Sequence, residues 1–337
     1  MILKEFRQMR RDRRTVALMV GLPLMMLIIF GYAARFDVKE IETAVVGPGA
    51  DLAVSQLDDA FTVVHQDRSG TEADARALLA DSEAAVAIVT GPDPKVLVDG
   101  TELFIAQSAL RRGDSLPPDI SSEILFNPDL STAAVMVPSL IGLILLFIGT
   151  VITSLGVVRE REQGTLEQLA VTPLRPVDVI VGKIAPYFVV ALIDMVIITL
   201  AGILIFDVPF RGSFGLFAVF GLIYLFVVLG FGVLISTVSR SQGEAIQLAI
   251  MILLPQVMLS GMIFPLKSMA AGVRWIGYML PLTYFVQAMR GIFLKASSFD
   301  ALATPLVILL GMAVAVFGLA VWRFRRDVAP KMAKAAQ

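Results

Sequence analysis

The sequence predicts an α-helical polytopic membrane protein with six transmembrane helices and a small α/β domain inserted between the first two. Hydrophobic residues make up 57% of the 337 residues, against roughly 45–50% in a typical globular protein. They are gathered into runs of about 20 residues, the length that crosses a hydrocarbon core ~30 Å thick. The segment between the first two runs instead alternates short apolar and charged stretches, which is typical of a soluble domain.

Six apolar runs are long enough to cross a membrane, and an even number places both termini on the same side. They lie at residues 16–34, 132–157, 180–206, 214–238, 243–264 and 302–323. Six Lys and Arg residues precede the first run, and a basic tail at residues 324–337 follows the last. Because short basic flanks stay in the cytoplasm, both termini are expected to be cytoplasmic.

Residues 1–15 are predicted to form an amphipathic helix that leads into the first span, residues 16–34. Ile2, Leu3, Phe6 and Met9 recur at helical spacing, with basic residues elsewhere on the wheel, the pattern of a helix lying at a membrane surface. A signal peptide is the alternative. It is disfavoured because the apolar run is long enough to span and no small-residue cleavage site precedes Arg35.

Residues 36–130 are predicted to form the extracytoplasmic α/β domain. This segment has 18 acidic and 6 basic residues, a balance of −12, which leaves +11 for the remainder because the whole chain carries −1. Strands are expected at 41–47, 61–66, 84–90 and 95–100, helices at 50–60 and 71–83, and a further helix with a Pro-rich connection within 103–130. Thr71 and Asp74 form a capping pair. His65 is the only histidine and no cysteine accompanies it, so no metal site is expected.

The most charged short loop between two apolar runs begins at Arg159. Arg159, Glu160, Arg161 and Glu162 alternate in sign, Leu166 and Leu169 then share a helical face, and Pro173 ends the pattern. Residues 159–173 are therefore predicted to form a short amphipathic helix at the membrane surface.

Within the membrane region, residues 131–323, two features carry alternatives. Gly142, Gly149 and Gly156 recur every seven residues, so close helix packing is favoured over a substrate groove. Asp194 lies near the centre of the third run, where a carboxylate is costly and is a functional candidate by default. A hydrogen-bonded packing residue or a carboxyl kept protonated is the alternative, and it is favoured over a substrate or proton role. Glu244 and Gln247 near the start of the fifth run complete the candidate substrate pathway.

Residues 265–300 are apolar but interrupted by Lys267, Arg274, Pro281, Arg290 and Lys295. Short interfacial or re-entrant helices on the outer side are expected, because no uninterrupted stretch reaches 18 residues. A full additional hairpin is the alternative.

The motifs that the sequence lacks restrict its chemistry. It contains no phosphate-binding loop of the form G-x-x-x-x-G-K-[ST] and no H-E-x-x-H. The chain is therefore not expected to be an enzyme, and any ATP hydrolysis would take place on a partner.

Four segments, in order along the chain, resemble the permease subunits of type-2 ABC exporters with a large extracytoplasmic domain between the first two spans. These are RDRRTVALMVGLPLMMLIIFGYA, REREQGTLEQLAVTPLRP, LPQVMLSGMIFP and LPLTYFVQAMRGIFLK. The resemblance covers essentially the whole chain. It implies export of an amphipathic drug, antibiotic or lipid-like molecule across the cytoplasmic (inner) membrane of a bacterium.

The resemblance also implies partners and residue roles. Residues 159–173 would be the coupling helix, and residues 1–15 the connecting helix. ATPase contacts would be made by Glu160, Glu162, Gly164, Thr165, Leu166, Glu167 and Leu169. An outer gate would be formed by Phe264, Pro265, Pro281, Tyr284 and Phe285. The partners would be two ABC ATPase subunits that carry ATP and Mg, a second permease as homodimer or heterodimer, and membrane lipid, but no nucleic acid; this chain itself would hold no cofactor.

Two other functions compete with this interpretation. One is a membrane receptor or scaffold whose outer domain binds a ligand, resembling phage-infection membrane proteins. The other is an intramembrane enzyme that uses Asp194, which is weakened because no second carboxylate sits at a matching depth. Copurification of an ATPase subunit would separate the exporter from both.

Overall fold

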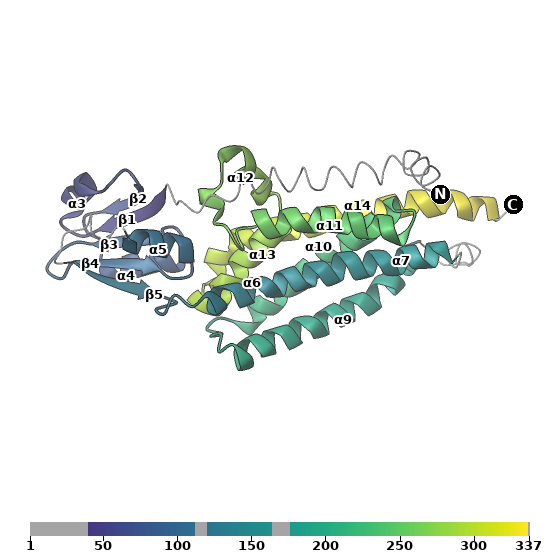
Figure 1. Ribbon diagram of the computed structural model, residues 1–337, viewed down its shortest axis with the longest axis horizontal. Helices are drawn as coiled ribbons and strands as arrows, with labels where there is room; N and C mark the ends of the chain where they lie inside the picture. The colour runs from purple at the N-terminus through teal and green to yellow at the C-terminus, as the bar shows by residue number, and fades with distance from the viewer. Residues whose placement is uncertain (1–39, 112–119, 164–175, 336–337) are drawn as a thin grey trace, which may run out of the picture.

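The computed structural model describes residues 40–111, 120–163 and 176–335. A mixed α/β domain lies at one end of a bundle of long helices (Figure 1). We call the end of the bundle beside this domain the domain end, and the opposite end, where helix α7 finishes, the far end. The predicted connecting helix, residues 1–15, and first span, residues 16–34, lie outside the described residues.

The domain is built on a five-stranded sheet in the order β2-β1-β3-β4-β5. Only the β3–β4 pairing is antiparallel, and β1–β2, β1–β3 and β4–β5 are parallel. The strands are β1 (Ile41–Val46), β2 (Phe61–Asp67), β3 (Val86–Val89), β4 (Lys95–Asp99) and β5 (Ser121–Leu125). β5 was not expected from the sequence, because SSEIL is short and polar and has one strongly apolar pair at its end.

Three helices cover the two faces of this sheet. α3 (Ala50–Gln56) and α5 (Leu103–Arg111) pack on the face that presents Ile41 and Val45. α4 (Glu72–Ala80) packs on the opposite face, against Ala44 and Val46. The predicted cap of α4 is confirmed, since the Thr71 side chain and the Asp74 carboxylate each bond the other's backbone N–H. Burial on both sheet faces explains why β3 is uniformly apolar and why β1 ends in Ala44, Val45 and Val46.

Five helices of the described part are long and apolar enough to cross a membrane. The first is a continuous run of α6 (Thr132–Phe147), the π-helical η2 (Ile148–Ile152) and α7 (Thr153–Glu162). The others are α9 (Pro176–Ile205), α10 (Phe214–Val238), α11 (Gln242–Leu259) and α14 (Phe299–Ala335). They match the predicted second to sixth spans, and the sixth expected span, residues 16–34, lies outside the described residues.

The segment between α11 and α14 forms four short helical pieces, and their re-entrant position on the outer side stays a prediction. They are η3 (Leu266–Ser268), α12 (Ala271–Tyr278), α13 (Pro281–Arg290) and η4 (Gly291–Lys295). α12 has 8 residues and α13 has 10, which correspond to about 12 and 15 Å of helix. Neither can cross a ~30 Å hydrocarbon core, so an additional hairpin does not fit.

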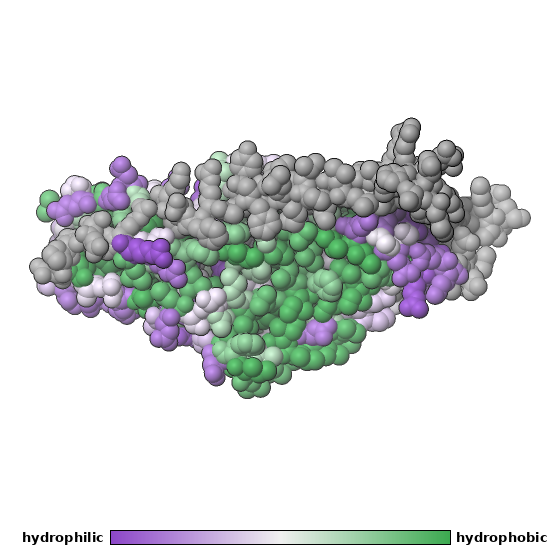
Figure 2. Space-filling view, in the orientation of Figure 1, coloured by the Kyte–Doolittle hydropathy of each residue, from purple (hydrophilic) through white to green (hydrophobic). Residues whose placement is uncertain are grey.

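On the face that Figure 2 shows, the visible surface of the bundle is mostly apolar over its middle and hydrophilic toward both ends. Large hydrophobic side chains on α9 are exposed, among them Val190, Ile193 and Ile197, each at least 50% exposed. Exposed apolar side chains over the length of a spanning helix are what contact with lipid or with another membrane helix requires. The same pattern would be a liability for a water-soluble protein.

The three glycines of the seven-residue repeat lie at close contacts, as predicted, but with three different helices. A methyl group on Gly142 would overlap the ring of Phe285 in α13. One on Gly149 would overlap Val228 in α10, and one on Gly156 would overlap the Tyr187 hydroxyl in α9. Close packing is therefore confirmed, and the stripe serves as a contact line for the helices gathered around α6–α7.

Candidate functional site

At the far end, the charged terminus of α7 is bound to the turn between α10 and α11. The two carboxylate oxygens of Glu162 accept hydrogen bonds from the backbone N–H of Gln242, at 3.0 Å, and from its side-chain amide, at 2.6 Å. The guanidinium of Arg161 donates to the backbone carbonyl of Ser239, at 3.1 Å. The first N–H groups of a helix have no intrahelical acceptor and attract negative charge, so Glu162 stabilises the start of α11.

The same turn is closed by a second carboxylate, that of Glu244. Ser241 caps α11 by accepting a hydrogen bond from the Glu244 backbone N–H, at 3.2 Å, while the Glu244 carboxylate accepts one from Arg240 N, at 2.8 Å. We call this hydrogen-bonded unit, which comprises Arg161, Glu162, Ser239, Arg240, Ser241, Gln242 and Glu244, the far-end clamp. It makes the end of α7 and the start of α11 move together.

The structure describes two of the seven predicted ATPase contacts. Glu162 is exposed although both of its oxygens are already hydrogen-bonded within the chain, and Glu160 is half-buried. The other five, Gly164, Thr165, Leu166, Glu167 and Leu169, lie outside the described residues. The sequence did not reveal that Glu162 caps another helix, because its partner Gln242 is 80 positions away.

Two of the predicted substrate-pathway residues, Glu244 and Gln247, lie one turn apart at the start of α11, and Asp194 lies at another level of the bundle. Asp194 is half-buried in the middle of α9, and within the described part of the chain its carboxylate has no hydrogen bond or ion pair. The Gln247 side-chain oxygen is buried without a hydrogen-bond partner there. Glu244 belongs to the far-end clamp. The pathway role of the three therefore stays a prediction.

The predicted outer-gate residues all lie at the domain end. The Phe285 ring stacks on Tyr224 with their centroids 4.2 Å apart, and the Tyr284 hydroxyl donates to the Tyr278 carbonyl at 2.7 Å. Pro281 begins α13, where its missing N–H costs no hydrogen bond. Phe264 packs in a separate apolar cluster with Leu266 and Met269, beside Pro265. These side chains fill the end of the bundle, and whether they open remains a prediction.

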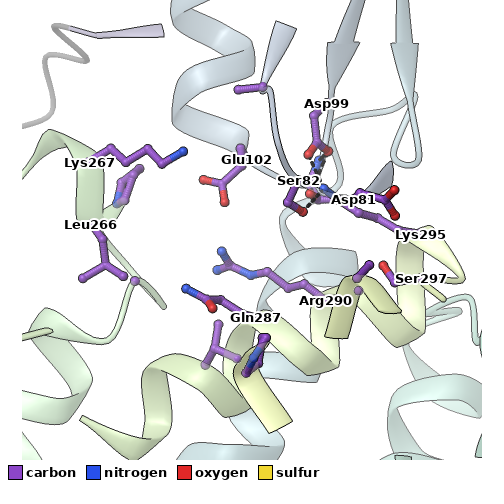
Figure 3. A pocket seen from close by; sticks show the side chains of 18 of the residues that line it. Asp81, Ser82, Asp99, Glu102, Leu266, Lys267, Gln287, Arg290, Lys295 and Ser297 are labelled. Atoms are coloured by element: carbon purple, nitrogen blue, oxygen red, sulfur yellow. Dashed lines mark hydrogen bonds and ion pairs between the residues drawn. The ribbon is translucent and has the colours of Figure 1, made fainter. Parts of the chain in front are cut away.

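A feature that sequence reasoning missed is a cavity of about 330 Å³ between the α/β domain and the domain end of the bundle. Acidic side chains reach it from the domain and basic ones from the bundle (Figure 3). The labelled lining residues are Asp81, Ser82, Asp99, Glu102, Leu266, Lys267, Gln287, Arg290, Lys295 and Ser297. The basic residues that interrupt the apolar segment 265–300 were the signal: three of them line this cavity.

A buried ion pair joins the two walls of this cavity. The Lys295 ammonium lies 2.6 Å from the Asp99 carboxylate, and the side chains are 3% and 2% exposed. Lys295 also donates to the Leu79 carbonyl, at 2.9 Å, and to the Ser82 hydroxyl, at 2.7 Å. Such a pair is favourable only when its remaining hydrogen bonds are satisfied, and here all three ammonium donors have an acceptor.

Two further contacts hold the domain on the bundle. Lys267, beside α12, pairs with Glu42 of β1. Arg211, in the α9–α10 connection, donates to the carbonyls of Phe126 and Leu294, at 3.3 and 3.2 Å. Together with Lys295, these contacts fix the domain on η3, η4 and the α9–α10 connection, so a movement of those segments would carry the domain with it.

Glu102, at the start of α5, has a different environment. Its carboxylate faces the Arg290 guanidinium across the cavity (Figure 3), but within the described residues it forms no hydrogen bond and no ion pair. Burial raises the pKa of the Glu102 carboxyl, because the charged form has lost water. The positive charge of Arg290 opposes that shift without cancelling it.

Comparison with known proteins decides the family. The sequence model described as "ABC-2 family transporter protein" matches residues 13–322, which is most of the chain. The chain belongs to the ABC-2 transporter family. A permease of this family is a transport subunit that partners ABC ATPase subunits.

Named relatives agree with an ABC-2 permease. The chain is 29% identical to the probable multidrug ABC transporter permease YbhS of Escherichia coli K12, over 94% of this chain and 93% of that protein. It is 28% identical to the probable multidrug ABC transporter permease YbhR of the same strain, over 97% and 98%. ABC transporter G family member 20 of Dictyostelium discoideum is 30% identical over 52% of this chain and 24% of its own length.

Proposed function

We propose that this ABC-2 permease is the membrane subunit of an ATP-driven exporter and that its ATPase docks at the far end, on residues 159–173. The observation that carries the proposal is the far-end clamp. The run from α6 through α7 is continuous from the domain end to the clamp, and Glu162 ties its terminus to α11. A push on that terminus would therefore reach two spanning helices at once.

The remaining parts of the proposal concern the partners and the cargo. Two ATPase copies, carrying ATP and Mg, and a second permease would complete the complex, with both termini of this chain in the cytoplasm. The exposed apolar face of α9 supports contact with lipid or a second permease. An amphipathic cargo fits spans that offer apolar and small side chains, and the relatives YbhS and YbhR carry the description of multidrug permeases.

The first test combines Glu160→Lys with Glu162→Lys in the full chain and measures the ATPase that copurifies with it from native-host membranes. We expect at least ~10-fold less ATPase, because charge pairs at the interface are lost. The matched control is Asp59→Lys with Glu83→Lys, two exposed acids of the α/β domain. We expect that pair to copurify ATPase as the unaltered chain does.

Two single variants separate contact from clamp. Glu162→Gln removes the charge but keeps an oxygen that can accept from Gln242, whereas Gln242→Ala keeps the charge and removes one internal bond. If Glu162 contacts the ATPase, the first variant loses ATPase and the second retains it. Copurification equal to the control pair in all of these variants would overturn docking at this end.

A further inference from the structure

We propose that the cavity between the α/β domain and α13 binds a zwitterionic amphipath, with its oxyanion at Arg290 and its ammonium at Glu102. The inference deepens the proposed function by assigning a ligand class to the domain end. It starts from the charges left over when the cavity's ion pairs are counted: Asp81, which is exposed, and Glu102 and Arg290, which are half-buried. Asp99 is paired with Lys295, and Lys267 with Glu42. Arg290 and Glu102 have no ion pair within the described residues, and they lie on opposite walls (Figure 3).

Arg290 has unused hydrogen-bonding capacity. One guanidinium N–H donates to the Met262 carbonyl, at 2.9 Å, and the buried Nε has no acceptor in the described part of the chain. A guanidinium has five N–H donors arranged to bind a carboxylate or phosphate through two of them. A half-buried guanidinium whose Nε is buried without an acceptor is costly for the protein alone, and an oxyanion in the cavity would satisfy it.

A second orphaned group points to the same space. Ser260, 1% exposed, lines the cavity, and its hydroxyl has no hydrogen-bond partner among the described residues. Buried polar atoms are rarely left unsatisfied in native proteins. Arg290, Glu102 and Ser260 come from α13, the start of α5 and the end of α11, so three separate elements present unfilled polar groups to one cavity.

The opposite charges determine the class of ligand. A simple anion at Arg290 would face the Glu102 carboxylate across the same low-dielectric space, and a simple cation at Glu102 would face Arg290. A molecule that carries both an ammonium and an oxyanion offers each wall a charge of opposite sign. Glu102 and Arg290 then both lose water and gain a charged partner. The exposed carboxylate of Asp81 at the rim adds a second attraction for the ammonium.

The size and walls of the cavity indicate an amphipath rather than a small hydrophilic solute. A volume of about 330 Å³ is near the lower limit of ligand pockets, roughly 300–1,000 Å³, and suits a headgroup better than a whole lipid. Ile105, Leu266 and Leu302 supply apolar lining. Thr304, in the second turn of α14, also lines the cavity. Val307 lies one turn further along the same helix and is 68% exposed. An apolar tail would therefore leave the cavity along α14.

The test is a calorimetric titration of the purified full chain in a sugar-headgroup detergent, without ATPase. The probes are dihexanoyl phosphatidylethanolamine, dihexanoyl phosphatidylglycerol and soluble phosphoethanolamine. The ethanolamine lipid is expected to bind at least ~10-fold more tightly than the glycerol lipid, because only it has an ammonium for Glu102. If phosphoethanolamine binds as tightly as the ethanolamine lipid, the apolar tail contributes nothing. The ligand would then be a soluble zwitterion, and the proposal of an amphipath would be overturned.

Variants assign the two charges. Glu102→Gln is expected to weaken the ethanolamine lipid at least ~10-fold but not the glycerol lipid, whose phosphate no longer faces a carboxylate, and Arg290→Gln to weaken both. Arg274→Gln is the matched control, since Arg274 also donates to backbone carbonyls and has a buried Nε without an acceptor, but does not line the cavity. It should bind as the unaltered chain does.

A third variant keeps the proposal testable if Arg290→Gln fails to fold. Gln287→Trp fills the cavity from an exposed position on α13 without changing a charge, and it should abolish binding. Equal affinity for both lipids, or binding unchanged by Glu102→Gln and Gln287→Trp, would overturn the proposal. Because no ATPase is present, such a failure would leave docking at the far end untouched, and loss of docking would leave this binding intact.

Discussion

Replacing Lys295 with methionine is expected to lower the free energy of unfolding of the full chain by about 3–5 kcal/mol, because it leaves a buried charge without its partner. The Asp99 carboxylate is 2% exposed and lies 2.6 Å from the Lys295 ammonium. Its other described contacts are with Thr101, whose backbone N–H and hydroxyl both donate to one oxygen. Thermal or denaturant unfolding of the protein in detergent measures the effect.

The matched control is Lys267→Met, which removes a lysine from the same junction. Lys267 pairs with Glu42, but the two side chains are 39% and 27% exposed, and solvent-accessible pairs contribute about 0–1 kcal/mol. A double change, Lys295→Met with Asp99→Leu, should recover much of the loss because no buried charge remains. If Lys295→Met were no more destabilising than Lys267→Met, the buried pair would not hold the domain as described.

Gly232→Ala is expected to destabilise the bundle by about 1–3 kcal/mol, the usual cost of overpacking a close contact. A methyl group there would overlap the backbone carbonyl oxygen of Gly149 and would lie 2.7 Å from the Thr153 side chain. A backbone oxygen cannot rotate away as a side chain can, so α10 must shift from the α6–α7 run. Thermal unfolding in detergent and the loss of any transport activity would report that shift.

Gly311→Ala provides the control within the same membrane region. Gly311 lies in α14, and nothing approaches within 4 Å of the position that its methyl group would take. Alanine is a better helix former than glycine by about 0.8–1.0 kcal/mol, so this variant should be neutral or slightly stabilising. Equal destabilisation by the two variants would show that general glycine replacement, rather than the α10 contact, is responsible.

Patterns that act over short distances along the chain could be predicted from the sequence. The apolar runs located the five described spans, and short apolar stretches bounded by turn residues located β1 to β4. The capping pair Thr71 and Asp74 was also correct. β5 was missed because an edge strand in parallel pairing with β4 depends on its partner more than on its own five residues.

Contacts between distant segments could not be predicted in this way. Lys295 reaches Ser82, 213 positions away, and Glu162 reaches Gln242, 80 positions away. The sequence marked Lys267, Arg290 and Lys295 only as interruptions of an apolar segment. What they do became visible once the sheet domain was placed against α13 and η4, because charges inside a protein acquire a role from the partner that the fold brings to them.

We propose that this ABC-2 permease couples ATP hydrolysis at the far end to movement of an amphipathic molecule through the bundle. This coupling is tested most directly with inside-out vesicles that contain the full chain and the ATPase that copurifies with it. We expect uptake of a fluorescent amphipathic dye that requires ATP, stops with a non-hydrolysable ATP analogue and falls with Glu160→Lys and Glu162→Lys. Uptake that is the same without ATP, or in vesicles that lack this chain, would contradict the account.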